Sequence, residues 1–157
     1  MTGARHLPVL LLALCALAGC GSIKSKLGIG PPHASLRSLS VAADPGANSG
    51  NGTQLDIVVV YSSSAIAALP KTGPDWFRQR DGLKKSLGKD IEVVSVESAS
   101  PDEVFAVELP RKTRRKGLAV YAFANYVDPG GWPPIALTAY KKAALRLQAK
   151  SIEVSEQ

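Results

Sequence analysis

Residues 55–61 read LDIVVVY, a run of apolar and β-branched residues with turn residues on either side. Such a run predicts a well-buried β-strand. Residues 118–124, LAVYAFA, are apolar at both odd and even positions. Because strand side chains alternate between two faces, this second run predicts a strand at the centre of a sheet, buried on both faces.

Shorter strand candidates surround these two runs. Extended stretches are predicted to begin near Leu36 and to cover 91–97 and 104–109. The end of the chain is ambiguous, because residues 140–150 have the composition of a helix but alternate in polarity from Leu145 onward. The alternation continues through residues 152–155, so we favour strands over a helix in this region.

One segment, residues 75–88, predicts a helix. The segment has residues at the three- and four-residue spacing of a helix, namely Trp76, Arg80, Leu83 and Leu87. Pro74 suits the helix start and Gly88 suits its C-cap. Gly82 weakens the middle by about 1 kcal/mol relative to alanine, which leaves two short turns as an alternative. Six or seven short strands with one helical insert predict a mainly β chain folded as a β-sandwich.

The first 20 residues predict export. An apolar run from Leu7 to Leu17 follows Arg5 and ends in small residues, the layout of a secretory signal, and it is too short to span a bilayer. The sequence Leu17-Ala18-Gly19-Cys20 resembles the lipobox of bacterial lipoproteins. That resemblance implies a diacylglycerol group and an N-acyl chain on Cys20. An ordinary signal peptide cut nearby is the alternative.

Three parts are therefore expected along the chain. Residues 1–19 form the signal peptide, residues 20–34 a lipidated N-terminus and flexible tether, and residues 35–157 a periplasmic domain. Residue 21 is glycine rather than aspartate. By resemblance to lipoprotein sorting in enteric bacteria, this implies the periplasmic face of the outer membrane.

Composition argues against several classes of function. The 157 residues carry a net charge of +6, which outside the cytoplasm favours anionic lipid, cell-wall polymer or an acidic protein face over nucleic acid. Once the signal is removed, His33 is the only histidine and Cys20 the only cysteine, too few for a usual zinc site. The serines at 62–64 lack a base partner and a nucleophile-elbow motif. We expect no enzymatic activity and no metal or dissociable cofactor.

The densest charge is the run RKTRRK at residues 111–116. Its basic residues are Arg111, Lys112, Arg114, Arg115 and Lys116. The run lies between two predicted strands and so predicts a hairpin loop. One interpretation is a solvated tip that protects sheet edges from aggregation. The other is contact with phospholipid head groups or an acidic partner.

Two further loops carry candidate functions. Residues 44–52 join the first two predicted strands, and the loop is rich in residues that tolerate unusual backbone angles. It is either a flexible connection or a recognition loop on a rigid domain. Trp132 lies in a loop at residues 128–134, where packing is favoured over a role as an interface anchor.

The order of these segments resembles the TssJ family, the outer-membrane lipoproteins of type VI secretion systems. The resembling segments are the lipobox, the tether, ANSGNGTQ at 47–54 running into the strand at 55–61, residues 75–77, 87–90 and 100–103, and the strand from Leu118 followed by Trp132. The resemblance covers most of the chain after the signal.

This resemblance implies a transthyretin-like β-sandwich of two sheets with a short helical insert and a protruding loop between the first two strands. It implies that this loop docks on the periplasmic domain of TssM, an inner-membrane secretion protein, and so anchors the secretion complex. Carried over by position, the docking residues are Ala47, Asn48, Ser49, Gly50, Asn51 and Gly52. The alternative is an independent periplasmic lipoprotein that binds a small ligand or an anionic or cell-wall polymer.

Overall fold

The computed structural model describes residues 33–97 and 104–157. The predicted signal peptide, Cys20 and the predicted tether as far as residue 32 lie outside the described residues, as does the predicted turn at 100–103. Within the part that is described, no helix is both long and apolar enough to cross a membrane.

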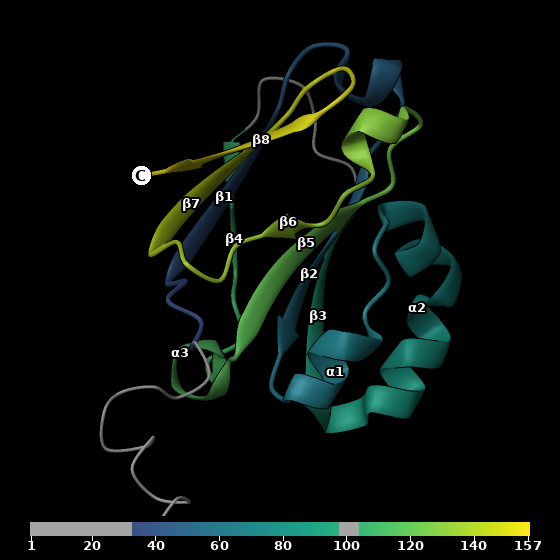
Figure 1. Ribbon diagram of the computed structural model, residues 1–157. Coiled ribbons are helices and arrows are strands. Elements are labelled where there is room, and N and C mark those ends of the chain that lie inside the picture. The colour runs from purple at the N-terminus through teal and green to yellow at the C-terminus, as the bar shows by residue number, and fades with distance from the viewer. Residues whose placement is uncertain (1–32, 98–103) are drawn as a thin grey trace, which may run out of the picture. The chain divides into compact units, whose positions relative to one another are not determined.

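The strands form two four-stranded sheets packed face to face (Figure 1). Sheet A has the order β4-β1-β7-β8, with β1 at Ser38–Ala43, β4 at Val104–Val107, β7 at Lys142–Leu147 and β8 at Ile152–Glu156. Sheet B has the order β3-β2-β5-β6, with β2 at Gln54–Val60, β3 at Ile91–Glu97, β5 at Ala119–Ala124 and β6 at Ile135–Ala136. The predicted sandwich is confirmed, and the ambiguous end of the chain forms strands.

Neighbouring strands are antiparallel with one exception. β1 and β7 run parallel, and Leu39 lies opposite Ala143. On its other side β1 pairs with β4, where Leu39 lies opposite Val107. The first strand of the domain is therefore an inner strand of sheet A, although both of its partners lie far away in the sequence.

Sheet B is buried on both faces, as its apolar runs predict. In β2, Leu55, Ile57 and Val59 belong to the core between the sheets. Val58 and Val60 pack on the opposite face against the helices. That second layer consists of α1 at Ser63–Ala68 and α2 at Gly73–Leu87 (Figure 1). β2 and β5 are thus apolar at both odd and even positions because one face packs in the sandwich core and the other packs against the helices.

The predicted helix is confirmed as one continuous element, α2. The Thr72 hydroxyl caps its start by accepting from Asp75 N at 3.2 Å, Pro74 stands in the first turn, and Gly88 ends it with φ 49°. Gly82 lies within the helix and does not divide it. The alternative of two short turns is therefore wrong, because packing of Trp76 offsets the weak helix propensity of glycine.

The prediction of a hairpin at residues 111–116 is wrong. β4 belongs to sheet A and β5 to sheet B, so this segment crosses between the sheets. β5 is already paired on both edges, with β2 and with β6, which leaves β4 no edge to join. The crossing contains a short helical turn, α3 at Thr113–Lys116.

Candidate functional site

Three loops meet at one end of the sandwich, which we call the loop end. They are residues 44–53 after β1, residues 125–132 after β5, and residues 148–151 between β7 and β8. Figure 1 shows them together at the top, with the blue turn η1 (Ala47–Gly50) and the light green turn η3 (Pro129–Gly131) beside the yellow β7–β8 turn. Asn48 N donates to Gln148 O and Ser49 N to Ala149 O, each at 3.0 Å.

The buried amide of Asn48 ties the first two loops together. Its side chain is 1% exposed. Nδ2 donates to Asn125 O at 3.2 Å, and Oδ1 accepts from Val127 N at 2.7 Å. Because both atoms of the amide are satisfied inside the protein, Asn48 sets the shape of the loop rather than presenting its side chain to a partner.

The backbone of this loop is left-handed at several positions. The φ angles are 78° at Gly46, 49° at Asn48, 56° at Ser49 and 80° at Gly50. Glycine and asparagine adopt this region readily, whereas serine pays about 1–2 kcal/mol. The Ala-Asn-Ser-Gly composition therefore suits a tight turn that reverses the chain between the two sheets.

The six predicted docking residues divide into two groups. Ala47 is half-buried against the sandwich core, and Asn48 is buried. The exposed residues are Ser49, Gly50, Asn51 and Gly52. Asn51 Nδ2 donates to Asn48 O at 3.1 Å, which adds a local brace. The surface offered by the loop is thus small, polar and held in one conformation.

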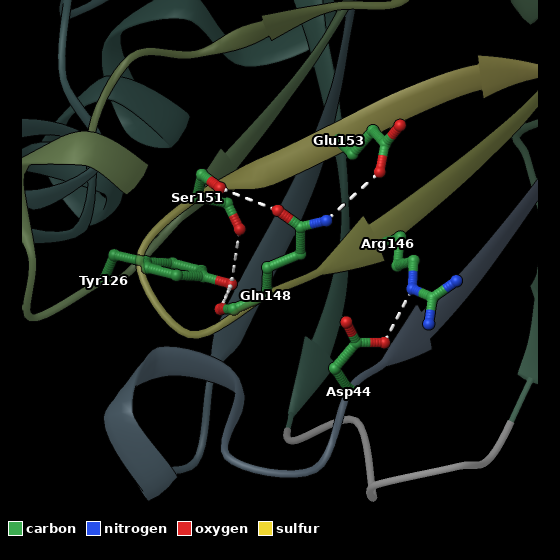
Figure 2. A network of polar contacts seen from close by, with 6 residues as sticks. All are labelled: Asp44, Tyr126, Arg146, Gln148, Ser151 and Glu153. Atoms are coloured by element: carbon green, nitrogen blue, oxygen red, sulfur yellow. Dashed lines mark hydrogen bonds and ion pairs between the residues drawn. The ribbon is translucent and has the colours of Figure 1, made fainter.

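A polar network braces the third loop (Figure 2). The Tyr126 hydroxyl donates to Gln148 O at 2.7 Å and lies 3.2 Å from Ser151 O. Ser151 Oγ donates to Gln148 Oε1 at 2.9 Å. Burial raises the pKa of Tyr126 to about 12, so its proton stays in place as the donor to these carbonyls.

Trp132 is half-buried and packs against the sandwich core. Its Nε1 donates to Tyr126 O at 3.0 Å. Trp132 O accepts from Gly73 N at 2.7 Å, which joins the loop to the start of α2. The favoured interpretation of packing is confirmed by these contacts.

The basic residues 111, 112 and 114–116 form a second candidate site, which we call the basic cluster. It lies at the opposite end of the sandwich from the loop end, where β4 finishes and β5 begins (Figure 1). An open hollow of about 550 Å³ is lined by Arg111, Lys112, Arg115 and Lys116. Arg111, Arg114, Arg115 and Lys116 are exposed.

Lys112 differs from the rest because it is fixed in place. Its Nζ lies 2.8 Å from Glu92 Oε1 and 4.5 Å from the centre of the Tyr61 ring. The Tyr61 hydroxyl donates to Glu92 Oε2 at 2.6 Å. Partial burial raises the pKa of Glu92, but the hydrogen bonds from Lys112 and Tyr61 outweigh it and leave that pKa below its ordinary value.

Replacing Glu92 by glutamine should lower the free energy of unfolding at neutral pH by less than about 1 kcal/mol, because both partners of this ion pair are more than one-third exposed. A lowered pKa stabilises the folded state above the unfolded pKa, and that stabilisation is lost as the pH falls through the folded pKa. Urea titrations near pH 7 and near pH 3 measure the change. A difference that persists undiminished in acid would contradict this account. Glu108→Gln is the control, because Glu108 is exposed and directly follows β4.

Groups for chemistry are sparse in the described residues. Between residues 33 and 97 and from 104 to 157, no group of three or more His, Cys, Asp or Glu side chains is placed to hold a metal ion. His33 is exposed. Ser62 Oγ accepts from Ala65 N at 3.2 Å and so caps α1.

Sequence reasoning alone misses Asn125, Tyr126 and Gln148. Asn125 and Gln148 take part mainly through backbone carbonyls, which every residue carries. For Tyr126 the available signal is an aromatic residue within a loop rich in glycine, proline and polar residues. Their roles depend on contacts across more than twenty residues of sequence, which no local pattern records.

Comparison with known proteins gives a likeness in structure. No protein-family model matches the chain, and no curated protein matches it. Lip of Serratia marcescens, a membrane-bound component of the type VI secretion system, aligns with a TM-score of 0.52 and 11% identity over 76% of this chain and 96% of Lip. A chain of a type VI membrane complex aligns with a TM-score of 0.54 and 12% identity over 75% of this chain and 95% of its own length.

A third solved structure, the type VI lipoprotein TssJ1 of Pseudomonas aeruginosa, aligns with a TM-score of 0.49 and 16% identity, over 81% of this chain and 98% of TssJ1. At 11–12% identity, the likeness to Lip and to the membrane-complex chain shows that the fold is shared. It leaves function to be argued from the residues themselves.

Proposed function

We propose that this chain is a lipid-anchored lipoprotein on the periplasmic face of the outer membrane and a structural component of a type VI secretion membrane complex. In this proposal the loop at residues 44–52 docks on the periplasmic domain of TssM. The lipid holds the protein in its membrane and the loop holds its partner. The role is mechanical, and no catalysis is involved.

The observation that carries the proposal is the construction of the loop. A buried asparagine with two satisfied hydrogen bonds holds four small exposed residues in one conformation. A loop fixed in this way loses little conformational entropy on binding. The shared fold of Lip and of a membrane-complex chain supports the same assignment.

The proposed anchor is Cys20. Its lipobox context supports acylation, and three acyl chains at about 0.8 kcal/mol per buried methylene would hold the protein on the membrane permanently. The fourteen residues from Gly21 to Ala34 could span about 46–50 Å when fully extended.

The test introduces bulk at the exposed tip without touching Asn48. Gly52→Arg should weaken binding to the periplasmic region of the TssM-like protein from the same bacterium by at least about tenfold, since the side chain would stand where the partner sits. Biolayer interferometry on the chain from residue 20, with Cys20→Ser to prevent acylation, measures the affinity. The thermal midpoint of the variant should stay unchanged.

Gly82→Arg is the matched control. Gly82 is also exposed, lies in α2, and has no heavy atom within 4 Å of the position of an added Cβ. This variant should bind as the wild type does. Equal binding by Gly52→Arg and Gly82→Arg would remove the loop from the interface. No binding by a folded wild-type domain would favour the independent lipoprotein, with the basic cluster as its anionic-ligand site.

A further inference from the structure

We infer that the basic cluster is a membrane-facing surface that binds the anionic head groups of the bilayer in which Cys20 is anchored. This orients the sandwich with its loop end away from that bilayer. The inference rests on the lipidation of Cys20 in the proposed function. Four arguments support it: the position of the chain entry, the rigidity of the cluster, its free charge and the charge of neighbouring residues.

The chain enters the domain beside the basic cluster. Ala34 N donates to Gly117 O at 2.9 Å, and Gly117 directly follows the cluster. Ala34 is 5% exposed, so the entry point is fixed in the core. Any tether from Cys20 therefore joins the domain at the end that carries the cluster.

The cluster is held rigidly. Thr113 is 1% exposed, and its backbone closes the turn: Thr113 N donates to Pro110 O at 2.9 Å and Gly117 N to Thr113 O at 2.8 Å. A Cβ at Gly117 would lie 2.5 Å from Thr113 O, so the close turn needs glycine there. The arginines and lysines of α3 are thus presented from a fixed backbone rather than from a flexible tip.

Most of the charge is free to act on a partner. Within residues 33–97 and 104–157, Lys112 forms an ion pair with Glu92. The other four basic residues of the cluster form none, namely Arg111, Arg114, Arg115 and Lys116. Each basic residue near an anionic membrane surface contributes about 1 kcal/mol of binding free energy. Several such residues beside an anchor turn a weak contact into a persistent one, because tethering raises the effective concentration of the surface.

Other cations extend this surface. Arg37 and Lys141 flank the starts of β1 and β7, joined by Arg37 N donating to Lys141 O at 2.8 Å. β1 begins at the end of the sandwich where Ala34 enters. At the loop end, by contrast, Arg146 forms an ion pair with Asp44, and Gln148 Nε2 donates a hydrogen bond to Glu153 (Figure 2). Exposed cations thus continue from the cluster to the starts of β1 and β7, which favours a lipid surface at this end.

The experiment measures binding of the acyl-free chain, from residue 20 with Cys20→Ser, to vesicles of phosphatidylcholine with and without roughly one-third phosphatidylglycerol. The wild type should sediment with the anionic vesicles, and added salt should release it. Arg114→Glu with Arg115→Glu should reduce this binding by at least about tenfold. Both side chains are exposed. Arg114→Gln with Arg115→Gln removes the two charges without reversing them and should reduce vesicle binding by a smaller factor.

The matched control reverses the same number of charges elsewhere. Lys71 precedes α2 near the loop end, Lys150 lies in the β7–β8 turn, and both are exposed. Lys71→Glu with Lys150→Glu should reduce vesicle binding by less than about threefold. Equal losses in the two double variants would mean that net charge alone drives binding and would overturn the inference. So would equal binding of the wild type to neutral and anionic vesicles.

Failure of this inference is distinguishable from failure of the proposed function. Binding to the TssM-like domain is measured without lipid, and vesicle binding is measured without that domain. Arg114→Glu with Arg115→Glu should leave docking on the TssM-like domain unchanged, because the two surfaces lie at opposite ends of the sandwich. Loss of docking in this variant would instead identify the basic cluster as a contact with an acidic protein.

Discussion

Replacing Asn48 by alanine will lower the free energy of unfolding by about 2–4 kcal/mol and will abolish the fixed shape of the loop end. The substitution removes the side-chain partner of Val127 N and of Asn125 O, and each lost hydrogen bond costs about 0.5–1.5 kcal/mol. Alanine at a φ of 49° adds about 1 kcal/mol of backbone strain. Urea denaturation of the acyl-free chain measures the change, and docking on the TssM-like domain should fall more than tenfold in parallel.

Asn51→Ala is the control for this prediction. Asn51 is exposed, has a φ of −90°, and loses a single side-chain hydrogen bond to Asn48 O. Its cost should stay below about 1 kcal/mol. Hydrogen exchange should show the Asn48 and Ser49 amides, which donate to Gln148 O and Ala149 O, opening in Asn48→Ala but not in Asn51→Ala. Equal costs for the two alanine variants would contradict the central role of Asn48.

Trp76→Ala should cost still more, about 4–5 kcal/mol, and lower the thermal midpoint by at least about 10 °C. Trp76 is fully buried between α2 and sheet B, and its ring stacks on Phe123 with centroids 5.0 Å apart. Its Nε1 donates to Asp56 Oδ2 at 2.8 Å. Removing the indole therefore creates a cavity and leaves a carboxylate that is 1% exposed with only Arg80, at 3.5 Å, as its charged partner.

Two further variants separate the contributions. Trp76→Phe keeps the stacking on Phe123 but loses the donor to Asp56, and should cost about 1–3 kcal/mol. Gln79→Ala removes an exposed side chain from the same helix and should change stability by less than about 0.5 kcal/mol. Thermal denaturation followed by circular dichroism gives all three values. A loss below about 2 kcal/mol for Trp76→Ala would show that α2 is dispensable to sheet B.

The layers of this fold could be predicted from the sequence because they follow from local patterns. LDIVVVY at 55–61 is largely apolar at both odd and even positions, and it forms an inner strand covered on both faces. Pro74 and Gly88 mark the ends of α2 because caps are set by residues that are near in sequence. The alternation after Leu145 predicts the final strands for the same reason.

The connections between layers could not be predicted in this way. Whether the segment at 111–116 returns within a sheet or crosses between sheets depends on which strand edges are already occupied. One edge of β5 is occupied by β2, which lies far earlier in the chain, and the other by β6. An asparagine in a polar loop is expected to be exposed. Asn48 is instead buried, because its side chain bonds to Asn125 and Val127, which lie 77 and 79 residues away. The predicted docking set therefore contains a side chain that supports the loop alongside those at its surface.

The parallel pairing of β1 with β7 bears on the order in which the molecule can assemble. β1 precedes the other described strands of the domain in the sequence, yet it pairs only with strands that contain Val107 and Ala143, far later in the chain. Until those strands pair with it, Leu39 and Val41, both about 1% exposed in the finished protein, have no sheet to cover them. Non-local pairing of this kind slows folding and leaves apolar surface exposed in an aggregation-prone, partly folded chain. The first strand in the sequence is thus the one whose burial comes late, after β7 has joined the sheet.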